Sequence, residues 1–453
     1  MNDKTREVFR NAPVPVAVLT NIIPSIVSMI MVLLYNLADT FFIGQTKDPL
    51  MVAAVSVATP AFLLFMAVGM LFGIGGTSLI SRTLGEGNER KARRISSFCF
   101  WTGLGIGVVS TLLMILFSRP ICMLIGASAD TVGYASQYLS IVALGIPFLI
   151  LSNAFSNIIR AEGKPVIAMA GMIAGNLVNI VFDPIMILSF GWDVAGAAIA
   201  TVLGNVVSSV IYLVHLLSKK SILSIHPKHY RVRNGILSGV FAIGIPASLN
   251  SVLMSFSNII INNLMQPHGD MAVAGLGVAM KVNMIVVMLL IGLGTGIQPL
   301  LGYCFGAGNR KRYMAVLKFS LCLALGLSAV MTVVCYAFAG PLVTAFLDNA
   351  DAYGFGMQFA RIYIYSGPIL GVLFVLMNAI QSTGAALPSL ILSLSRQGIL
   401  FIPTILILNT FHDARILSMA QPITDYLATT VAAILFIATY RKYLKKMQET
   451  TEA

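Results

Sequence analysis

The sequence predicts an all-α polytopic membrane protein with twelve transmembrane helices in two pseudo-symmetric six-helix bundles. The first observation is composition: 57% of the 453 residues are hydrophobic and only 10% are charged, with a mean hydropathy of +0.88. Soluble domains carry roughly 25% charged residues. The second is a set of twelve apolar stretches, each reaching the about 20 residues that cross a bilayer. The third is an internal repeat at an offset of about 221 residues.

The expected spans follow one another with short polar connections. Those of the first half cover 14–43, 52–79, 95–118, 132–155, 166–190 and 194–217. Those of the second half cover 236–263, 273–300, 314–339, 353–377, 387–410 and 416–440. No cleavable signal peptide is expected, because the first apolar run is long and no small-residue cleavage site follows it.

The repeat aligns turn residues, prolines, asparagines and glycines of the two halves. The turn sequence at 85–88 returns at 306–309, and Pro120, Pro147, Asn157 and Gly163 return as Pro341, Pro368, Asn378 and Gly384, all at 221. Pro24 and Asn36 return as Pro246 and Asn258 at 222. Six spans per half is an even number, so both halves enter the membrane in the same sense, as in transporters built from parallel repeats. We expect bundles at 1–218 and 236–453, joined by a basic linker at 219–235 that carries a surface helix.

The basic residues are distributed as topology signals. Of the 29 Lys and Arg, 23 fall on one side of the membrane if the N-terminus is cytoplasmic. This asymmetry predicts that both termini are cytoplasmic, and it argues against a nucleic-acid partner despite the net charge of +12. The five cysteines show no metal or redox spacing, and most are expected to be buried free thiols.

No motif of an enzyme or an ATP-driven pump is present. The chain contains no GxxxxGK[ST], HExxH or CxxC, and its glycine-rich pieces near 73–76 and 292–296 lie inside apolar spans rather than between a strand and a helix. We therefore expect neither a catalytic site nor a cofactor.

Ionisable residues within the spans are the best guide to mechanism, because charge in the hydrocarbon region is costly and needs a partner or water. The acidic ones are Asp39, Asp183 and Asp425, and the basic ones are Lys281, Arg361 and Arg396. All three basic residues lie in the second half, so the two halves are chemically unequal.

Asp39, Asp183 and Thr201 are expected at a common depth, about 6–10 Å below the outer boundary at about 1.5 Å per residue. Asn179 precedes Asp183 by four residues and shares its helix face. Two carboxylates, an amide and a hydroxyl provide oxygen ligands for a proton or Na⁺. The alternative is that Asp39 lines water at the rim and Asp183 satisfies a local amide. Pro184 leaves the carbonyl of Ile180 without its helical donor and can bend this span.

Two further patterns favour structural roles. Gly171 and Gly175 continue the Asn179–Asp183 stripe at four-residue spacing, which lets a neighbouring helix approach closely. Asp425 is expected to pair with Arg361 or Arg396, although a second acidic site is the alternative.

Six sequence segments occur in an order that resembles the multidrug and toxic compound extrusion (MATE) transporters over essentially the full length. They are PSIVSMIMVLLYNLADTFFIG, LISRTLGEGNERKA, IIRAEGKP, NLVNIVFDP, LLGYCFGAGNRKR and SRQGILFIP. The acid in the first span is most similar to the bacterial group of DinF-like and MepA-like exporters. Another branch carries carboxylates in the seventh and eighth spans, where this sequence has Lys281.

The resemblance implies a monomeric antiporter in the bacterial inner membrane that exports organic, often cationic, drugs against inward flow of H⁺ or Na⁺. It places the coupling ion, or a Na⁺ ion, at Asp39, Asn179, Asp183 and Thr201, and the drug cavity at Tyr35, Asn36, Asn153 and Asn157. The alternative is a lipid-linked oligosaccharide flippase, whose cationic cavity would use Lys281, Arg361 and Arg396.

Overall fold

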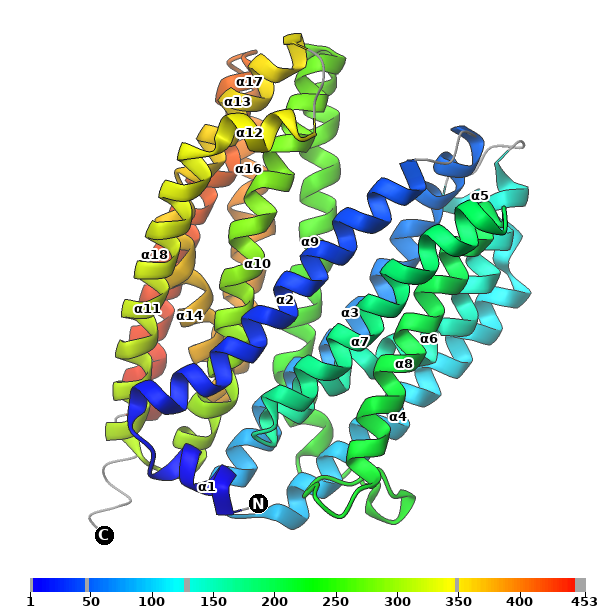
Figure 1. The fold of residues 1–453 in the computed structure, drawn as a ribbon. Helices are drawn as coiled ribbons and strands as arrows, with labels where there is room; N and C mark the ends of the chain where they lie inside the picture. The colour runs from blue at the N-terminus through cyan, green and yellow to red at the C-terminus, as the bar shows by residue number, and fades with distance from the viewer. Residues whose placement is uncertain (1–2, 45–48, 126–130, 347–349, 445–453) are drawn as a thin grey trace. The chain divides into compact units, whose positions relative to one another are not determined.

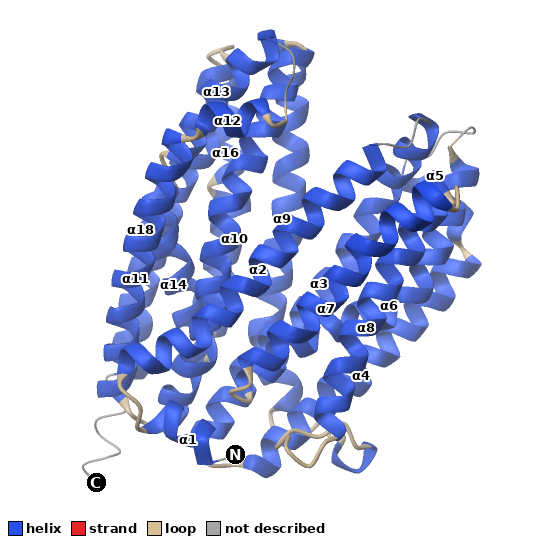
Figure 2. Ribbon diagram, in the orientation of Figure 1, coloured by secondary structure: helices blue, strands red, loops and turns tan. Residues whose placement is uncertain are grey.

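The computed structural model describes residues 3–44, 49–125, 131–346 and 350–444, and within these ranges every regular element is a helix (Figure 2). Eleven of the described helices are long and apolar enough to cross a membrane. A twelfth span results when the bent pair Ala352–Ile364 and Gly367–Thr383 is counted as one. The predicted class, an all-α multi-pass membrane protein with twelve spans, is confirmed.

The chain forms two compact units, and neither is continuous in sequence. Unit 1 combines Met1–Glu7 with Ile30–Gly244, and unit 2 combines Val8–Met29 with Ile245–Ala453. The helices α2 (Val14–Gly44) and α9 (Ile236–Met265) each begin in one unit and end in the other. These units differ from the bundles expected at 1–218 and 236–453. The repeat marks where the sequence similarity begins, whereas a helix of about 45 Å can pack its first half in one unit and its second half in the other.

Unit 1 is organised around helix α6 (Val132–Ala161), whose span is the most buried of those in the described chain. Helix α6 packs against α3 (Pro49–Gly85), α4 (Glu89–Leu116), α7 (Pro165–Pro184) and α8 (Asp193–Leu217). Figure 1 shows these helices in blue to green. The shorter elements are α1 (Asp3–Arg10), α5 (Ser118–Ile125), the π-helical turn Ile185–Ser189 and the 3₁₀ turn Pro227–His229.

Unit 2 repeats this plan around α10 (Asp270–Gly306) and α14 (Gly367–Thr383). These pack against α11 (Arg310–Ala337), α13 (Ala350–Ile364) and α18 (Ala420–Thr439). The remaining elements are the 3₁₀ turn Gln266–His268, α12 (Ala339–Thr344), α15 (Ala386–Leu394), the π-helical turn Ser395–Ile399, α16 (Phe401–Asn409), α17 (Ala414–Ser418) and the π-helical turn Tyr440–Leu444.

The repeated turn sequences at 85–88 and 306–309 have the same physical role. Gly87 and Gly308 adopt the left-handed conformation, with φ of 76° and 69°. Only glycine enters this region without a steric penalty. The next residue caps the following helix: Asn88 accepts from the Lys91 N–H at 3.0 Å, and Asn309 accepts from the Arg312 N–H at 2.9 Å. The sequence repeat is therefore also a repeat of local structure.

One pair of repeated prolines has different surroundings in the two halves. Pro147 lies inside the continuous helix α6, whereas Pro368 begins α14 after a 48° bend. The Ser366 hydroxyl donates to the Tyr363 carbonyl at 3.1 Å, which offers the backbone an alternative to continuing the helix. The span expected at 353–377 is therefore present as a bent pair of helices.

One smaller expectation changes and another is confirmed. The linker contains no surface helix beyond the 3₁₀ turn at Pro227–His229. Of the five cysteines, all free, Cys322 is exposed and the other four are buried.

Candidate functional site

The glycine stripe of α7 forms a tight seam with α8, as its spacing predicted. A Cβ atom on Gly175 would lie 2.5 Å from the Gly204 carbonyl oxygen and closer still to Ser208 Oγ. The Ser208 hydroxyl donates to the Gly171 carbonyl at 2.9 Å. Because the two helices touch along their backbones, the polar residues further along the same stripe are held in fixed register with α8.

That register places Asn179 between Asp183 and Thr201. The Asn179 amide satisfies both neighbours when its nitrogen donates to Asp183 Oδ2 at 2.8 Å. Its oxygen then accepts from the backbone N–H and the hydroxyl of Thr201, at 3.1 and 3.2 Å. The structure therefore joins three of the four predicted coupling residues in one hydrogen-bonded group.

Helix α2 brings the fourth coupling residue towards this group. The Tyr35 hydroxyl lies close to the Thr201 side chain. Asp39, one turn further along α2, lies within electrostatic range of Asp183. Tyr138 of α6 lies within range of both carboxylates. The sequence reasoning missed Tyr138, whose only signal was a tyrosine in the outer part of the fourth span.

The electrostatic setting of the two carboxylates is unusual for buried acids. Asp183 is fully buried, and its Oδ1 has no hydrogen-bond partner among the described residues. No ion pair to Asp39 or Asp183 occurs within the described chain. A buried carboxylate without a basic partner is costly, and a proton or a hard cation with oxygen ligands relieves that cost. The donor set of two carboxylates, an amide and hydroxyls fits either ion.

The backbone changes its helical register directly beside Asp183. The α-helical pattern of α7 ends at Pro184, and a π-helical turn follows at Ile185–Ser189. Proline has no N–H to donate, and π turns inside helices often occur at functional sites. The expected local disruption of this span is thus present as a change of hydrogen-bonding register.

The predicted cavity residues divide into two groups. Tyr35 joins the cation group through Thr201. Asn153 and Asn157 lie one turn apart on α6 and face the α3 glycines Gly69 and Gly73. The amide nitrogens of Asn36, Asn153 and Asn157 donate to the carbonyls of Val32, Leu149 and Asn153 on their own helices, at 2.9–3.0 Å. No recorded contact in the described chain links Asn153 or Asn157 to Asp183.

A buried arginine accompanies Asn157 and was not singled out from the sequence. Arg160 is 1% exposed and donates to Asn157 Oδ1 at 3.1 Å. Its other hydrogen-bonding neighbour is the sulfur of Met172 at 3.2 Å. The signal was available in IIRAEGKP, where an arginine follows a run of apolar residues at the end of a span.

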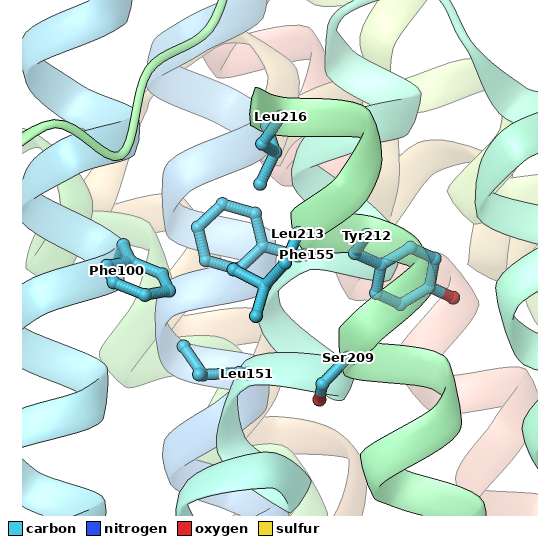
Figure 3. A pocket seen from close by; sticks show the side chains of 7 residues that line it. All are labelled: Phe100, Leu151, Phe155, Ser209, Tyr212, Leu213 and Leu216. Carbon is cyan, nitrogen blue, oxygen red and sulfur yellow. The ribbon is translucent and has the colours of Figure 1, made fainter. Parts of the chain in front are cut away.

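The small pocket in Figure 3 lies within the helix packing of unit 1. It lies among α4, α6 and α8 and is lined by Phe100, Leu151, Phe155, Ser209, Tyr212, Leu213 and Leu216. It leaves no room for a water molecule. We interpret it as a packing gap on the apolar side of unit 1.

The comparison with family models decides the family. The MatE model matches residues 24–185 and again 246–407, well over half of the chain. The chain belongs to the MatE family. The two matches also confirm the predicted repeat.

Individual relatives agree with this assignment, and solved structures share the fold. The chain is 30% identical to the multidrug export protein MepA of Staphylococcus saprophyticus over 409 residues, 90% of each chain. It is 30% identical to the MepA protein of Staphylococcus aureus over 410 residues, again 90% of each. An outward-facing structure of a multidrug resistance MATE family transporter superposes with a TM-score of 0.91 at 24% identity, over 99% of this chain and 100% of that one. A transporter structure from Pyrococcus furiosus gives 0.90 at 23% identity, over 99% of each chain.

Unit 2 carries its buried charges differently from unit 1. Arg396 Nε donates to Asp425 Oδ1 at 3.1 Å, with both side chains buried, and Gln421 donates to the same oxygen at 3.1 Å. The Arg396 guanidinium also lies over the Phe374 ring. The preferred expectation, that Asp425 pairs with an arginine, is confirmed with Arg396. Arg361 and Lys281 lie instead over the rings of Tyr336 and Phe346.

Proposed function

We propose that this protein exports organic, often cationic, drug-sized compounds, driven by inward movement of H⁺ or Na⁺. The observation that carries the proposal is the pair of carboxylates in unit 1, Asp39 and Asp183, for which the described chain records no ion pair. The relatives named multidrug export protein MepA support the export of drugs. The membrane-spanning helices support a transport role rather than catalysis.

The proposed cycle uses competition between the ion and the drug. Binding of a proton or Na⁺ at Asp183 and Asp39 would neutralise their charge and redirect the hydrogen bonds of Tyr35, which lies on the same helix as Asp39. Because α2 extends into both units, a change at its outer half can be transmitted along the helix. Loss of the ion towards the cytoplasm restores the carboxylate charge, which attracts the next cationic drug.

The proposed setting is the bacterial inner membrane, with both termini cytoplasmic and the protein acting as a monomer. The concentration of Lys and Arg on one side of the expected topology supports this orientation. The partners are small organic molecules and membrane lipid, with no nucleic acid and no tightly held cofactor.

The alternative of a lipid-linked oligosaccharide flippase has little to support it. That function would need Lys281, Arg361 and Arg396 to face a headgroup phosphate. Each instead has a local partner: Asp425 for Arg396, and an aromatic ring for the other two.

The test is efflux of a fluorescent cationic dye from liposomes, driven separately by a pH gradient and by a Na⁺ gradient. One gradient should drive efflux by the wild type, and the same gradient should fail with Asp183→Asn. Asp270→Asn, which alters an exposed carboxylate at the start of α10, is the matched control and should retain efflux. Folded wild-type protein that moves no dye under either gradient would contradict the proposal.

A further inference from the structure

The connection between α8 and α9 is fixed to unit 1 rather than hanging free. We call residues 218–235 the strap. Its backbone carbonyls accept hydrogen bonds from side chains along the first turns of α4. The bonds are Ser96 Oγ to Ser224 O at 2.8 Å, Ser97 Oγ to His226 O at 3.0 Å and Trp101 Nε1 to Ile225 O at 2.9 Å. Figure 1 shows this green segment at the lower ends of α4 and α8.

A buried carboxylate holds the beginning of the strap. Glu162, which follows α6 and is 2% exposed, accepts the Ile222 N–H on Oε1 at 2.6 Å. Its Oε2 pairs with His215 Nε2 in the last turn of α8 at 2.9 Å. Arg93 Nε donates to the Ile222 carbonyl at 3.1 Å. Since both peptide groups of Ile222 are held, the strap has a defined position against α4, α6 and α8.

This position gathers positive charge on one surface. The strap and the start of α4 together present Arg90, Arg93, Lys219, Lys220, Lys228, Arg231 and Arg233 as exposed side chains. No ion pair is recorded for any of these seven within the described residues. The contacts of Glu162 are with His215 and the Ile222 N–H, not with any of these seven side chains. The carboxylates of Glu86 and Glu89 lie at the turn between α3 and α4, beside Arg90.

The pKa of His229 reflects the excess of positive charge. Its pKa is lowered by partial burial first, and then by Arg93, His226 and Arg94. Its Nδ1 is hydrogen-bonded to Ser224 Oγ at 2.8 Å. The charged groups that lower its pKa come from both α4 and the strap, and each is an arginine or a histidine. A surface of this kind favours an anionic partner.

The surface lies where the apolar spans end. Its anchors are in the first turns of α4, after the end of α6 and in the last turn of α8. Trp101, whose indole is bonded to the strap, is 37% exposed, as suits a tryptophan at a membrane interface. Charges spread over seven residues match a layer of headgroups better than one enclosed anion.

We propose that the strap and the start of α4 bind the phosphate groups of anionic phospholipids in the cytoplasmic leaflet. The proposal rests on the orientation proposed above, but not on the identity of the drug or of the coupling ion. A free phosphate ion offers the same chemistry. The lipid is favoured because the surface is open and adjoins the ends of three spans.

The first test compares binding of phosphatidylglycerol by the full-length protein in native mass spectrometry of lipid-loaded samples. Arg231→Gln/Arg233→Gln removes two charges from the surface, and Lys311→Gln/Lys318→Gln removes two exposed charges from unit 2 as the matched control. The first pair should weaken binding roughly tenfold, since each basic residue near a membrane surface contributes severalfold. The control should leave most of it intact. Equal losses in both variants, or wild-type protein that does not prefer phosphatidylglycerol to phosphatidylcholine, would overturn the proposal.

The second test uses His229 as a local reporter in histidine-labelled protein, with its signal assigned through His229→Gln. The midpoint of its titration should rise when phosphatidylglycerol is added to phosphatidylcholine nanodiscs, because bound phosphate offsets Arg93 and Arg94. Inorganic phosphate alone should not reproduce the rise. A rise with inorganic phosphate in phosphatidylcholine nanodiscs, or an unchanged midpoint with phosphatidylglycerol, would contradict lipid binding. Both tests measure lipid contact, so neither outcome depends on drug transport.

Discussion

The two units hold buried acids in opposite electrostatic settings. In unit 1, Asp183 is fully buried, and neither it nor Asp39 has an ion pair recorded in the described chain. In unit 2, Asp425 is equally buried but is paired with Arg396. A carboxylate that is already paired with a guanidinium has no need of a mobile ion. This difference supports the proposal that cation exchange takes place in unit 1, whereas the Asp425 charge in unit 2 is balanced by Arg396.

Aligned positions of the two repeats also differ in their acidic residues. At the offset of 222 the position of Asp39 is occupied by Ile261, which is 1% exposed. At the same offset, the position of Asp183 is occupied by Ile405, which is fully buried. The two halves share spans, turns and prolines, but Asp39 and Asp183 have no counterpart acids in the second half, which has the Arg396–Asp425 pair instead.

The largest effect on stability is expected when the Arg396–Asp425 pair is broken. Arg396→Met leaves Asp425 buried without a partner, and the expected loss is about 3–5 kcal/mol. Arg396→Met/Asp425→Leu removes both charges and should recover most of that loss. Thermal unfolding in detergent, followed by tryptophan fluorescence, measures both variants. If the double variant is as unstable as the single one, the pair is not an isolated charge-balanced unit.

A smaller effect is expected at the seam that positions the cation group. Gly175→Ala forces a Cβ into Ser208 and the Gly204 carbonyl, which should cost about 1–3 kcal/mol. Gly105→Ala is the matched control, because nothing lies within 4 Å of a Cβ there. The control should be neutral or more stable by about 0.5–1 kcal/mol. The same thermal assay applies, and equal melting temperatures for the two variants would remove the argument that close packing fixes the site.

The smallest effect is expected at Thr201, which supports the cation group without a charge. Thr201→Val removes the hydroxyl that contacts Asn179 and Tyr35. Losing about 1 kcal/mol of hydrogen bonding should raise the ion concentration for half-maximal efflux about fivefold. Thr201→Ser should restore the wild-type value. Thr430→Val, at an exposed position of α18, should change nothing. A wild-type response in Thr201→Val would exclude Thr201 from the coupling group.

Much of the fold and the core of the site were predictable for physical reasons. Long apolar stretches must become helices in lipid, and glycine stripes mark close helix contacts, so the spans and the Gly171–Asp183 seam followed from the sequence. The pairing of Asp425 was predictable as one of two choices, because a buried acid needs a base. The choice of Arg396 rather than Arg361 as the partner of Asp425 depended on which arginine the helix packing brings close to that acid.

Other features depend on tertiary packing that one sequence does not encode locally. Examples are the break between Ile364 and Gly367, the π-helical turn after Pro184 and the division of α2 between units. Tyr138 reaches the carboxylates only through the packing of α6. The strap was expected as a basic linker with a surface helix, and its fixed position was not predictable because its anchors are serine and tryptophan side chains on α4 that have no pattern of their own.

The most direct test of unequal units compares ion-driven dye efflux by Asp39→Asn and by Arg396→Met/Asp425→Leu in liposomes, with protein amounts matched by the folded fraction. We expect Asp39→Asn to lose efflux under the gradient that drives the wild type, and the double variant to retain it. Retained coupling in Asp39→Asn together with lost coupling in the double variant would place the coupling ion in unit 2 and contradict the account.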